Sequence, residues 1–309
     1  MQVTLSQKSY LGPALVQLNS ELILGWTDTK SYLNLSSSSD YGQNWGVQTT
    51  SSQKSASAPA LAVLGEVLYI AWVGTDSKSS LNVMQTSDLK TFPVQEVINE
   101  SAHSTSGPAL AVFKDVLYIA WTGTNSQLNV AQIVNNIPSN IVTLEVDSNY
   151  DQQSHTSPAL AADDDYLYIA WTGLPYVKDS AGNIVNDIIT APADALTGGS
   201  AGGTDYASPY IYLMRSSDGS NFSGLVNTHE TSDSTNGPAL TVSGSNLILG
   251  WTGSDSSGYL NTMYSTDQGQ SFTGKETDTS NTSDLGPALS GEMIAWTGTD
   301  NSLNLKQGV

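Results

Sequence analysis

Apolar and polar residues alternate with a period of two along most of this chain. In VLYIAW (67–72), Leu68, Ile70 and Trp72 would face one side of an extended segment and the intervening residues the other. Such segments are rich in β-branched and aromatic residues, and turn-forming Gly, Asp, Ser or Asn separate them. No stretch shows a convincing helical period. The pattern therefore predicts an all-β chain of short strands joined by tight turns.

The alternating segments belong to a unit that occurs six times. Each unit opens with Pro-Ala-Leu, and the units start near residues 13, 59, 108, 158, 238 and 287. An apolar stretch follows and ends in tryptophan, at Trp26, Trp72, Trp121, Trp171, Trp251 and Trp296. In the second unit the pattern predicts strands over 59–63, 67–72, 80–85 and 92–97. Each unit is therefore expected to form four antiparallel strands.

Four short strands repeated at this interval are typical of a β-propeller blade, so we predict one six-bladed β-propeller over residues 1–309. A β-sandwich also has many short strands, but it does not require six copies of one sequence. The last unit stops at 303–309, after its third strand, and residues 2–7 form a strand that precedes the first unit. We expect this N-terminal strand to close the last blade, which removes open sheet edges.

Between the third and fourth strands, two units carry the turn Ser-x-Asp-x-Gly-x-x-aromatic. Its residues are Ser38, Asp40, Gly42 and Trp45 in one unit, and Ser265, Asp267, Gly269 and Phe272 in the other. Turns one residue shorter surround Asp88 and Asp218. In such a turn the Asp accepts backbone N–H groups, the Gly takes a positive φ and the aromatic ring anchors the turn in the core. We therefore interpret these residues as structural.

These turns resemble the Asp boxes of sialidase-like propellers. The segment GPALAVFKDVLYIAWTGTNSQLNV (107–130) is similar to a repeat of bacterial secreted proteins and propeller lectins. The resemblance covers nearly the whole chain except about 174–206, and it implies a fold more than a function. In the sialidase family, three arginines grip the substrate carboxylate. This chain has the single arginine Arg215, so sialidase activity is not expected and no catalytic residue is assigned.

Charge and composition narrow the range of partners. The chain has 29 Asp and Glu against 10 Lys and Arg, a net charge of −19, which disfavours nucleic acid and anionic membranes. No apolar run approaches the ~18 residues of a membrane span. The absence of cysteine excludes disulfides and thiolate chemistry. No signal peptide is visible, yet the low content of charged residues and the many Ser, Thr, Asn and Gly residues favour an extracellular location.

The loops between the second and third strands offer candidate ligand-binding residues. In a propeller, these loops share one face with the linkers between blades. They carry one short polar side chain per unit, except in the fourth: Asp28, Asp76, Asn125, Asp255 and Asp300. Such side chains suit the hydroxyl pairs of sugars, and with carbonyl oxygens they could bind calcium. They could equally cap their own turns.

Histidines and tryptophans leave similar alternatives open. His103 and His155 lie in linkers and join the ligand-binding candidates; with His229, also read as a linker residue, they could hold a metal. Their offsets from the next proline differ, which favours solvated histidines over a shared site. The six strand-two tryptophans could stack on sugars, but their regular phase favours packing between blades.

The symmetry breaks in the fourth unit, where an insertion at 174–206 follows the second strand. We expect it to project from the loop-bearing face, where it would cover the axis, offer a binding surface or do neither. The acidic run 163–165 falls in a turn between two strands, so we interpret it as solvated.

The sequence thus favours a non-catalytic, lectin-like propeller that recognises cell-surface or matrix glycans. No cofactor is expected, calcium is a secondary hypothesis, and the oligomeric state stays open. One alternative is a protein-interaction module of a secreted bacterial toxin or adhesin, which the single insertion would favour. Another is a glycoside hydrolase with an unrecognised carboxylate pair at ~5–9.5 Å.

Overall fold

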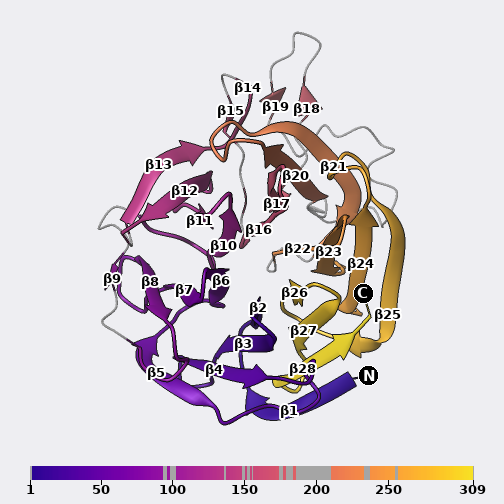
Figure 1. Ribbon diagram of the computed structural model, residues 1–309. Helices are drawn as coiled ribbons and strands as arrows, with labels where there is room; N and C mark the ends of the chain where they lie inside the picture. The colour runs from indigo at the N-terminus through magenta and orange to yellow at the C-terminus, as the bar shows by residue number, and fades with distance from the viewer. Residues whose placement is uncertain are drawn as a thin grey trace, which may run out of the picture.

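The computed structural model describes residues 2–92, 96–97, 102–135, 137–147, 150–151, 154, 156–173, 177–178, 184–185, 210–232, 237–254 and 257–308. Over these residues it forms six four-stranded antiparallel sheets around a common axis, with no helix (Figure 1). The predicted six-bladed β-propeller is therefore confirmed. None of the described residues forms a helix long and apolar enough to cross a membrane.

Each blade runs from an inner strand at the axis to an outer strand at the rim (Figure 1). Blade 1 comprises β2 (Ala14–Leu18), β3 (Glu21–Thr27), β4 (Tyr32–Ser38) and β5 (Thr49–Lys54). Blade 2 comprises β6 (Ala60–Leu64), β7 (Val67–Val73), β8 (Leu81–Thr86) and β9 (Glu96–Val97). Blade 3 comprises β10 (Ala109–Phe113), β11 (Val116–Thr122), β12 (Leu128–Val134) and β13 (Ile137–Thr143).

The other three blades repeat this order. Blade 4 comprises β16 (Ala159–Ala162), β17 (Leu167–Gly173), β20 (Tyr210–Ser216) and β21 (Ser223–Thr231). Blade 5 comprises β22 (Ala239–Ser243), β23 (Asn246–Thr252), β24 (Tyr259–Ser265) and β25 (Thr273–Thr282). Blade 6 comprises β26 (Ala288–Ser290), β27 (Met293–Thr297), β28 (Ser302–Gln307) and the N-terminal β1 (Gln2–Lys8).

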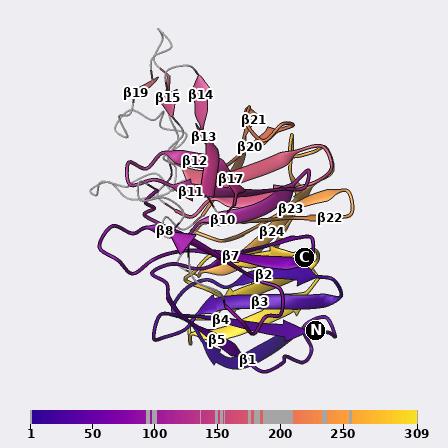
Figure 2. The same ribbon diagram turned by 60° about the vertical axis from the view of Figure 1, so that its left-hand side comes forward.

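Two small hairpins lie outside the blades. They pair β14 (Glu145–Asp147) with β15 (Tyr150–Asp151), and β18 (Val177–Lys178) with β19 (Ile184–Val185). The hairpin of β14 and β15 stands at the rim beyond blade 3 (Figures 1 and 2). Apart from β18 and β19, the insertion at 174–206 lies outside the described residues, so its expected role stays a prediction.

The ring closes through the strand pairing that we predicted. β1 runs antiparallel to β28, with Val3 opposite Leu305 and Thr4 opposite Asn304. The Thr4 hydroxyl donates a 2.7 Å hydrogen bond to Asn304 Oδ1. Both ends of the chain therefore lie in blade 6 (Figure 1), and non-covalent pairing between them holds the ring shut.

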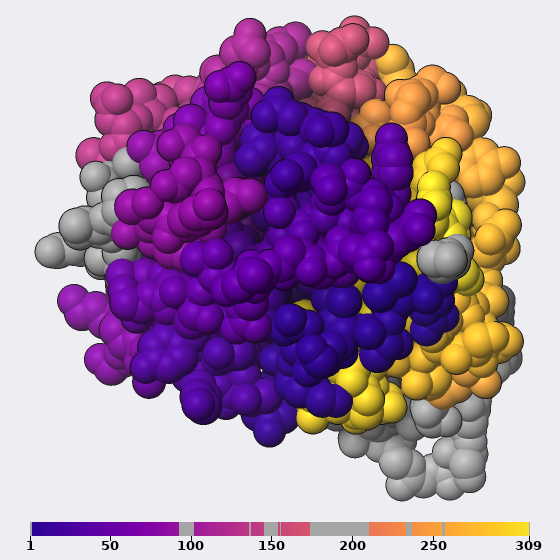
Figure 3. Space-filling view, turned by 60° about the horizontal axis from the view of Figure 1, so that its bottom comes forward, coloured from indigo at the N-terminus to yellow at the C-terminus, as the bar shows by residue number. Residues whose placement is uncertain are grey.

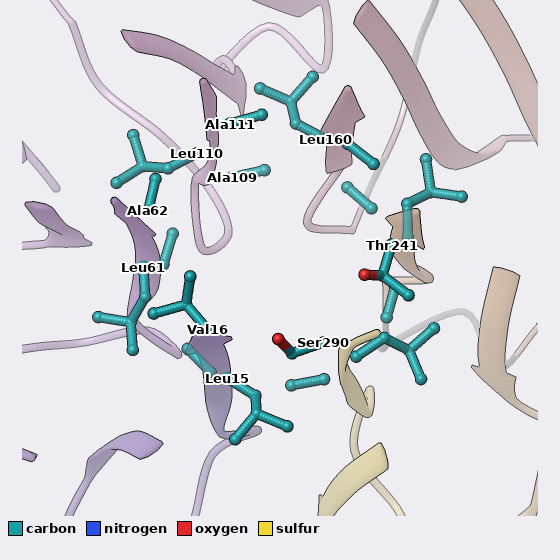
Figure 4. Close-up of a pocket in the computed structure, with 18 of the residues that line it drawn as sticks. Leu15, Val16, Leu61, Ala62, Ala109, Leu110, Ala111, Leu160, Thr241 and Ser290 are labelled. Atoms are coloured by element: carbon teal, nitrogen blue, oxygen red, sulfur yellow. The ribbon is translucent and has the colours of Figure 1, made fainter. Parts of the chain in front are cut away.

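Apolar side chains from neighbouring blades form the core. The Pro-Ala-Leu leucines point away from the axis, into the spaces between blades (Figure 4). The six strand-two tryptophans are all buried, which confirms core packing over an exposed stacking surface. Burying large aromatic side chains contributes strongly to stability.

Asparagines of the third strand, most of them buried, tie that strand to the fourth strand of the blade. Each Asn of the Leu-Asn pair donates from Nδ2 to the carbonyl oxygen two residues before it. In four blades its Oδ1 also accepts a hydrogen bond from a threonine of the outer strand. The pairs are Asn34 with Thr50, Asn129 with Thr143, Asn261 with Thr277, and Asn304 with Thr4. The repeated Leu-Asn motif is thus a structural element of the blade.

Two expected positions differ in the structure. Of the strand predicted at 92–97, only Glu96–Val97 is assigned to β9, and 93–95 lie outside the described residues. Phe92 precedes the strand and packs against the core between blades 1 and 2. His229 lies within the outer strand β21, so its expected place in a linker was wrong. An outer strand has only one neighbouring strand to fix its limits, so its ends are hard to read from sequence.

Candidate functional site

The linkers between blades and the loops between second and third strands share one face, which we call the loop face. Backbone bridges join Ser9 to Asp28, Ser55 to Gly74, Ser104 to Gly123, and Ser232 to Gly253. Each of these bridges connects a linker to such a loop. The remaining turns, between first and second and between third and fourth strands, form the opposite turn face. This arrangement agrees with the faces we predicted.

One buried serine per linker fastens neighbouring blades on the loop face. These junction serines are Ser9, Ser55, Ser104, Ser154, Ser232 and Ser283. For example, Ser9 donates its backbone N–H to Asn301 of blade 6 at 2.9 Å and its hydroxyl to the Thr27 carbonyl of blade 1 at 2.7 Å. Each of the six hydroxyls donates a hydrogen bond to the carbonyl oxygen of the residue that directly follows a strand-two tryptophan. Sequence reasoning missed them, although five lie four residues before Pro-Ala-Leu.

The inner strands surround an axial channel of about 390 Å³. Its lining is mostly Ala, Val and Leu, with the hydroxyls of Thr241 and Ser290 turned toward the space (Figure 4). No residue of this lining is Asp, Glu, His, Lys or Arg. The described lining therefore offers hydrogen-bonding groups but no general acid or base.

The loop-face mouth of the channel is a second hollow, of about 310 Å³. The residues that precede the inner-strand prolines form it, and several are glycines. A Cβ atom added at Gly286 would lie 2.6 Å from the Gly237 carbonyl oxygen, and one at Gly12 would lie 2.8 Å from that of Gly286. Both are closer than real Cβ contacts, so the mouth is a tight ring of backbone that larger side chains would disrupt.

The candidate loop side chains accept hydrogen bonds from their own turns. Asp28 Oδ1 accepts the N–H groups of Lys30 and Tyr32 at 2.8 and 2.9 Å. Asp76 accepts the backbone N–H groups of Lys78 and Ser80, and Asn125 that of Gln127. The carboxylates of Asp28 and Asp76 keep spare acceptor positions, because an ionised carboxylate has about four. The structure places one such group in each of these loops, and it shows no ligand role for them.

Asp300 makes the same local contacts and adds an ion pair. It accepts the backbone N–H and the hydroxyl of Ser302 at 2.9 and 2.7 Å, and Lys8 of β1 lies 3.5 Å away. The Ser302 hydrogen bonds hold the pKa of Asp300 below its usual value. Asp255 lies outside the described residues. Among the residues that are described, no three His, Asp or Glu side chains are grouped to hold a metal ion.

The candidate histidines are not gathered into one site. His103 is half-buried in the linker before blade 3 and pairs with Ser80 in a backbone bridge. His229 lies in β21 at the rim of blade 4, and His155 falls outside the described residues.

The Ser-x-Asp turns have the geometry expected for structural turns. In blade 1 the Ser38 hydroxyl donates to Asp40 at 2.8 Å, and the Gly42 N–H donates to that hydroxyl at 2.9 Å. The Asn44 N–H donates to Asp40 at 2.8 Å. Blade 5 repeats these bonds around Asp267. Phe272 and Trp45 pack partly buried against the cores.

Hydrogen bonding stabilises the ionised form of each turn carboxylate. The Asn44 backbone and side-chain amides lower the pKa of Asp40 to about 2, and the Ser271 hydroxyl lowers the pKa of Asp267 to about 2. The N–H and hydroxyl of Thr91 hold the pKa of Asp88 well below its usual range, and Asn221 does the same for Asp218. Each of these aspartates accepts three or four hydrogen bonds from its own turn, which agrees with a structural role.

The single arginine is engaged on the turn face. Arg215 of β20 donates from a terminal guanidinium nitrogen to the Gln268 carbonyl at 2.5 Å. Its guanidinium carbon lies 4.5 Å from the centroid of the Tyr166 ring. The hydrogen bond joins blade 4 to blade 5, and the ring contact lies within blade 4, so the arginine serves packing in this structure.

No model of a known protein family matches this chain, and none of the curated proteins matches it. Solved structures match it in fold. The fungal Aleuria aurantia lectin, described as a six-bladed β-propeller with fucose recognition, has a TM-score of 0.62 at 10% identity over 98% of this chain and 92% of the lectin.

Two sialidase structures match as well. The Hadza microbial sialidase has a TM-score of 0.58 at 12% identity, and the Trypanosoma rangeli sialidase one of 0.57 at 11%. This chain spans 65% and 54% of their lengths. The likeness at these identities establishes the propeller fold alone, and membership of an Asp-box repeat family stays a prediction.

Proposed function

We propose that this protein binds carbohydrate without hydrolysing it, as a lectin-like propeller that recognises neutral glycans on a cell surface or matrix. The observation that carries the proposal is how much of each chain is covered when this protein is compared with a carbohydrate-binding propeller. The chain and the fungal lectin cover 98% and 92% of each other, whereas the chain covers only 54–65% of the sialidases compared above. Six blades therefore correspond to nearly a whole lectin but only to part of those enzymes.

The chemistry of the axis supports binding over hydrolysis. A glycosidase needs two carboxyl groups that flank the scissile bond, and the described linings of the channel and its mouth contain none. The net charge of −19 repels anionic sugars such as sialic acid. Carboxylate and amide groups on the surface suit hydroxyl-rich neutral ligands.

A glycan array on the intact protein tests this proposal, with calcium and again with EDTA. We expect selective binding of one class of neutral glycan, retained in EDTA. Loss of binding in EDTA would place calcium at the site. A blank array under both conditions would overturn the proposal and favour a protein partner. Release of sugar from any bound glycan, abolished by one Asp or Glu substitution, would favour the hydrolase alternative instead.

A further inference from the structure

A small pocket opens on the turn face between blade 6 and blade 1, with a volume of about 160 Å³. We call it the junction pocket. Blade 1 contributes Gln17 from β2, Ser20 from the turn between β2 and β3, and Tyr41 from the Ser-x-Asp turn. Blade 6 contributes Ser290, Glu292 and Gln307. Figure 3 shows the N-terminal part of the chain (indigo) directly beside the C-terminal part (yellow).

Tyr41 is held at the pocket with its side chain in solvent. It is 72% exposed, and none of the described residues forms a hydrogen bond or ring contact with its side chain. Its φ of 57° lies in the left-handed region, which costs a bulky residue about 1 kcal/mol. The turn needs this conformation, but a Gly or Asn would satisfy it at lower cost. The aromatic ring is thus not explained by folding.

The equivalent position of blade 5 is filled. Gln268 occupies the place of Tyr41, with φ 58°, and donates to Asp165 of blade 4 at 3.1 Å. Arg215 reaches the backbone of the same turn. Gln307 is the counterpart of Arg215, because each pairs with the residue three positions before the strand-two tryptophan. At the junction pocket, the counterparts are Tyr41 and Gln307. Among the described residues, neither side chain forms a hydrogen bond to the neighbouring blade.

The same turn position is also closed at two other junctions. In blade 4 it is Gly219, which lies against the Tyr118 ring of blade 3, while Lys114 donates to the Ser217 carbonyl. In blade 2 it is Leu89, which packs against the core between blades 1 and 2. Of these four turns, that of blade 1 alone leaves a hollow with an exposed aromatic ring.

The pocket chemistry specifies a neutral, hydroxylated ring. Its lining contains no Lys, Arg or His, and the Glu292 side chain has no hydrogen-bond or ion-pair partner among the described residues. A free carboxylate and two amide side chains can bind vicinal hydroxyls, and a Tyr ring can stack on the apolar face of a sugar. The volume of about 160 Å³ suits one ring and not an extended chain.

We propose that the junction pocket binds one neutral pyranose residue at the end of a glycan, stacked on Tyr41 and hydrogen-bonded by Glu292 and the neighbouring amides. The proposal rests on the carbohydrate-binding function above and gives it one defined site. It also predicts one such site per chain, since the three equivalent turns are closed.

Saturation-transfer NMR with methyl glycosides of glucose, galactose, mannose, fucose and N-acetylglucosamine tests the site, with sialic acid as the charged probe. At least one neutral glycoside should bind, and Tyr41→Ala should weaken it by about tenfold or more. Tyr41→Phe should retain binding, because the ring stays. Glu292→Gln should weaken binding several-fold, because a charge-assisted hydrogen bond is lost. The matched control is Tyr10→Ala, which removes a 60% exposed tyrosine from the loop face.

The possible outcomes distinguish failure of the proposed site from failure of the proposed function. Unchanged binding in Tyr41→Ala and Glu292→Gln would overturn the junction pocket and leave carbohydrate binding in place. Failure to bind any methyl glycoside while the array shows glycan binding would do the same. Sialic acid bound more tightly than neutral sugars would overturn the ligand assignment. A blank array together with no methyl glycoside binding would overturn both proposals.

Discussion

The junction between blades 6 and 1 and the junction between blades 4 and 5 use the same backbone and end in different states. Both place a Ser-x-Asp turn, with a left-handed residue after the Asp, against the preceding blade. At one junction Arg215 and Gln268 fill the space with polar contacts. At the other, Tyr41 and Gln307 leave a pocket. A repeated scaffold thus fixes the position of a site, and side chains decide whether it opens.

The largest effect should come from breaking the closure of the ring in blade 6. Deleting residues 2–9 removes β1 and the first junction serine, and it exposes the edge of β28. We expect a loss of several kcal/mol of unfolding free energy, a drop in melting temperature of at least about 10 °C. A synthetic peptide of residues 2–9 should restore part of it by strand addition. An unchanged melting temperature would contradict closure by β1.

On the loop face, we expect the junction serines to stabilise the two junctions to a similar extent. Ser9→Ala and Ser232→Ala each remove a buried hydroxyl that donates to a backbone carbonyl. Each should cost about 1–3 kcal/mol in urea unfolding. The exposed Ser6→Ala in β1 is the control and should change stability by less than about 0.5 kcal/mol. Costs near zero at both junctions would show that the clamps are dispensable.

On the turn face the two junctions should respond differently. Arg215→Ala removes a hydrogen bond from blade 4 to blade 5 and a cation–π contact within blade 4, so we expect a cost of about 1 kcal/mol. The counterpart Gln307→Ala should cost less than about 0.5 kcal/mol, because none of the described residues forms a hydrogen bond with its side chain across the junction. Urea titrations of both variants measure the difference. Equal costs would show that the 4–5 contacts add nothing to stability.

The smallest effect concerns pH, and here the two junctions should again agree. The pKa values of Asp40 and Asp267 are lowered from 3.8 to about 2 in the folded protein. Their contribution is therefore fully present above pH 4 and is lost as pH falls through about 2. Asp40→Asn and Asp267→Asn should each flatten the decline of melting temperature between pH 4 and 2. The same slope in wild type and variants would show that these carboxylates do not set acid stability.

Much of the fold could be predicted from the sequence, because it depends on patterns among residues that are close together in the chain. The period-two segments, the six Pro-Ala-Leu units and the strand left over at the N-terminus predicted the blades and their closure by β1. The Ser-x-Asp turns were readable for the same reason, since their hydrogen bonds span at most four residues. The loop aspartates were left open between turn caps and ligand sites, and the structure shows the capping bonds without testing the ligand role.

The junctions between blades depended on tertiary structure. The spacing of the junction serines was present in the sequence, but the carbonyls they bind come from two different blades. In the junction pocket, Tyr41 and Glu292 lie some 250 residues apart in the sequence, and only ring closure brings them together. Strand period and turn chemistry act between near neighbours, so sequence determines them. Whether a space between two blades is filled depends on side chains that meet only after folding.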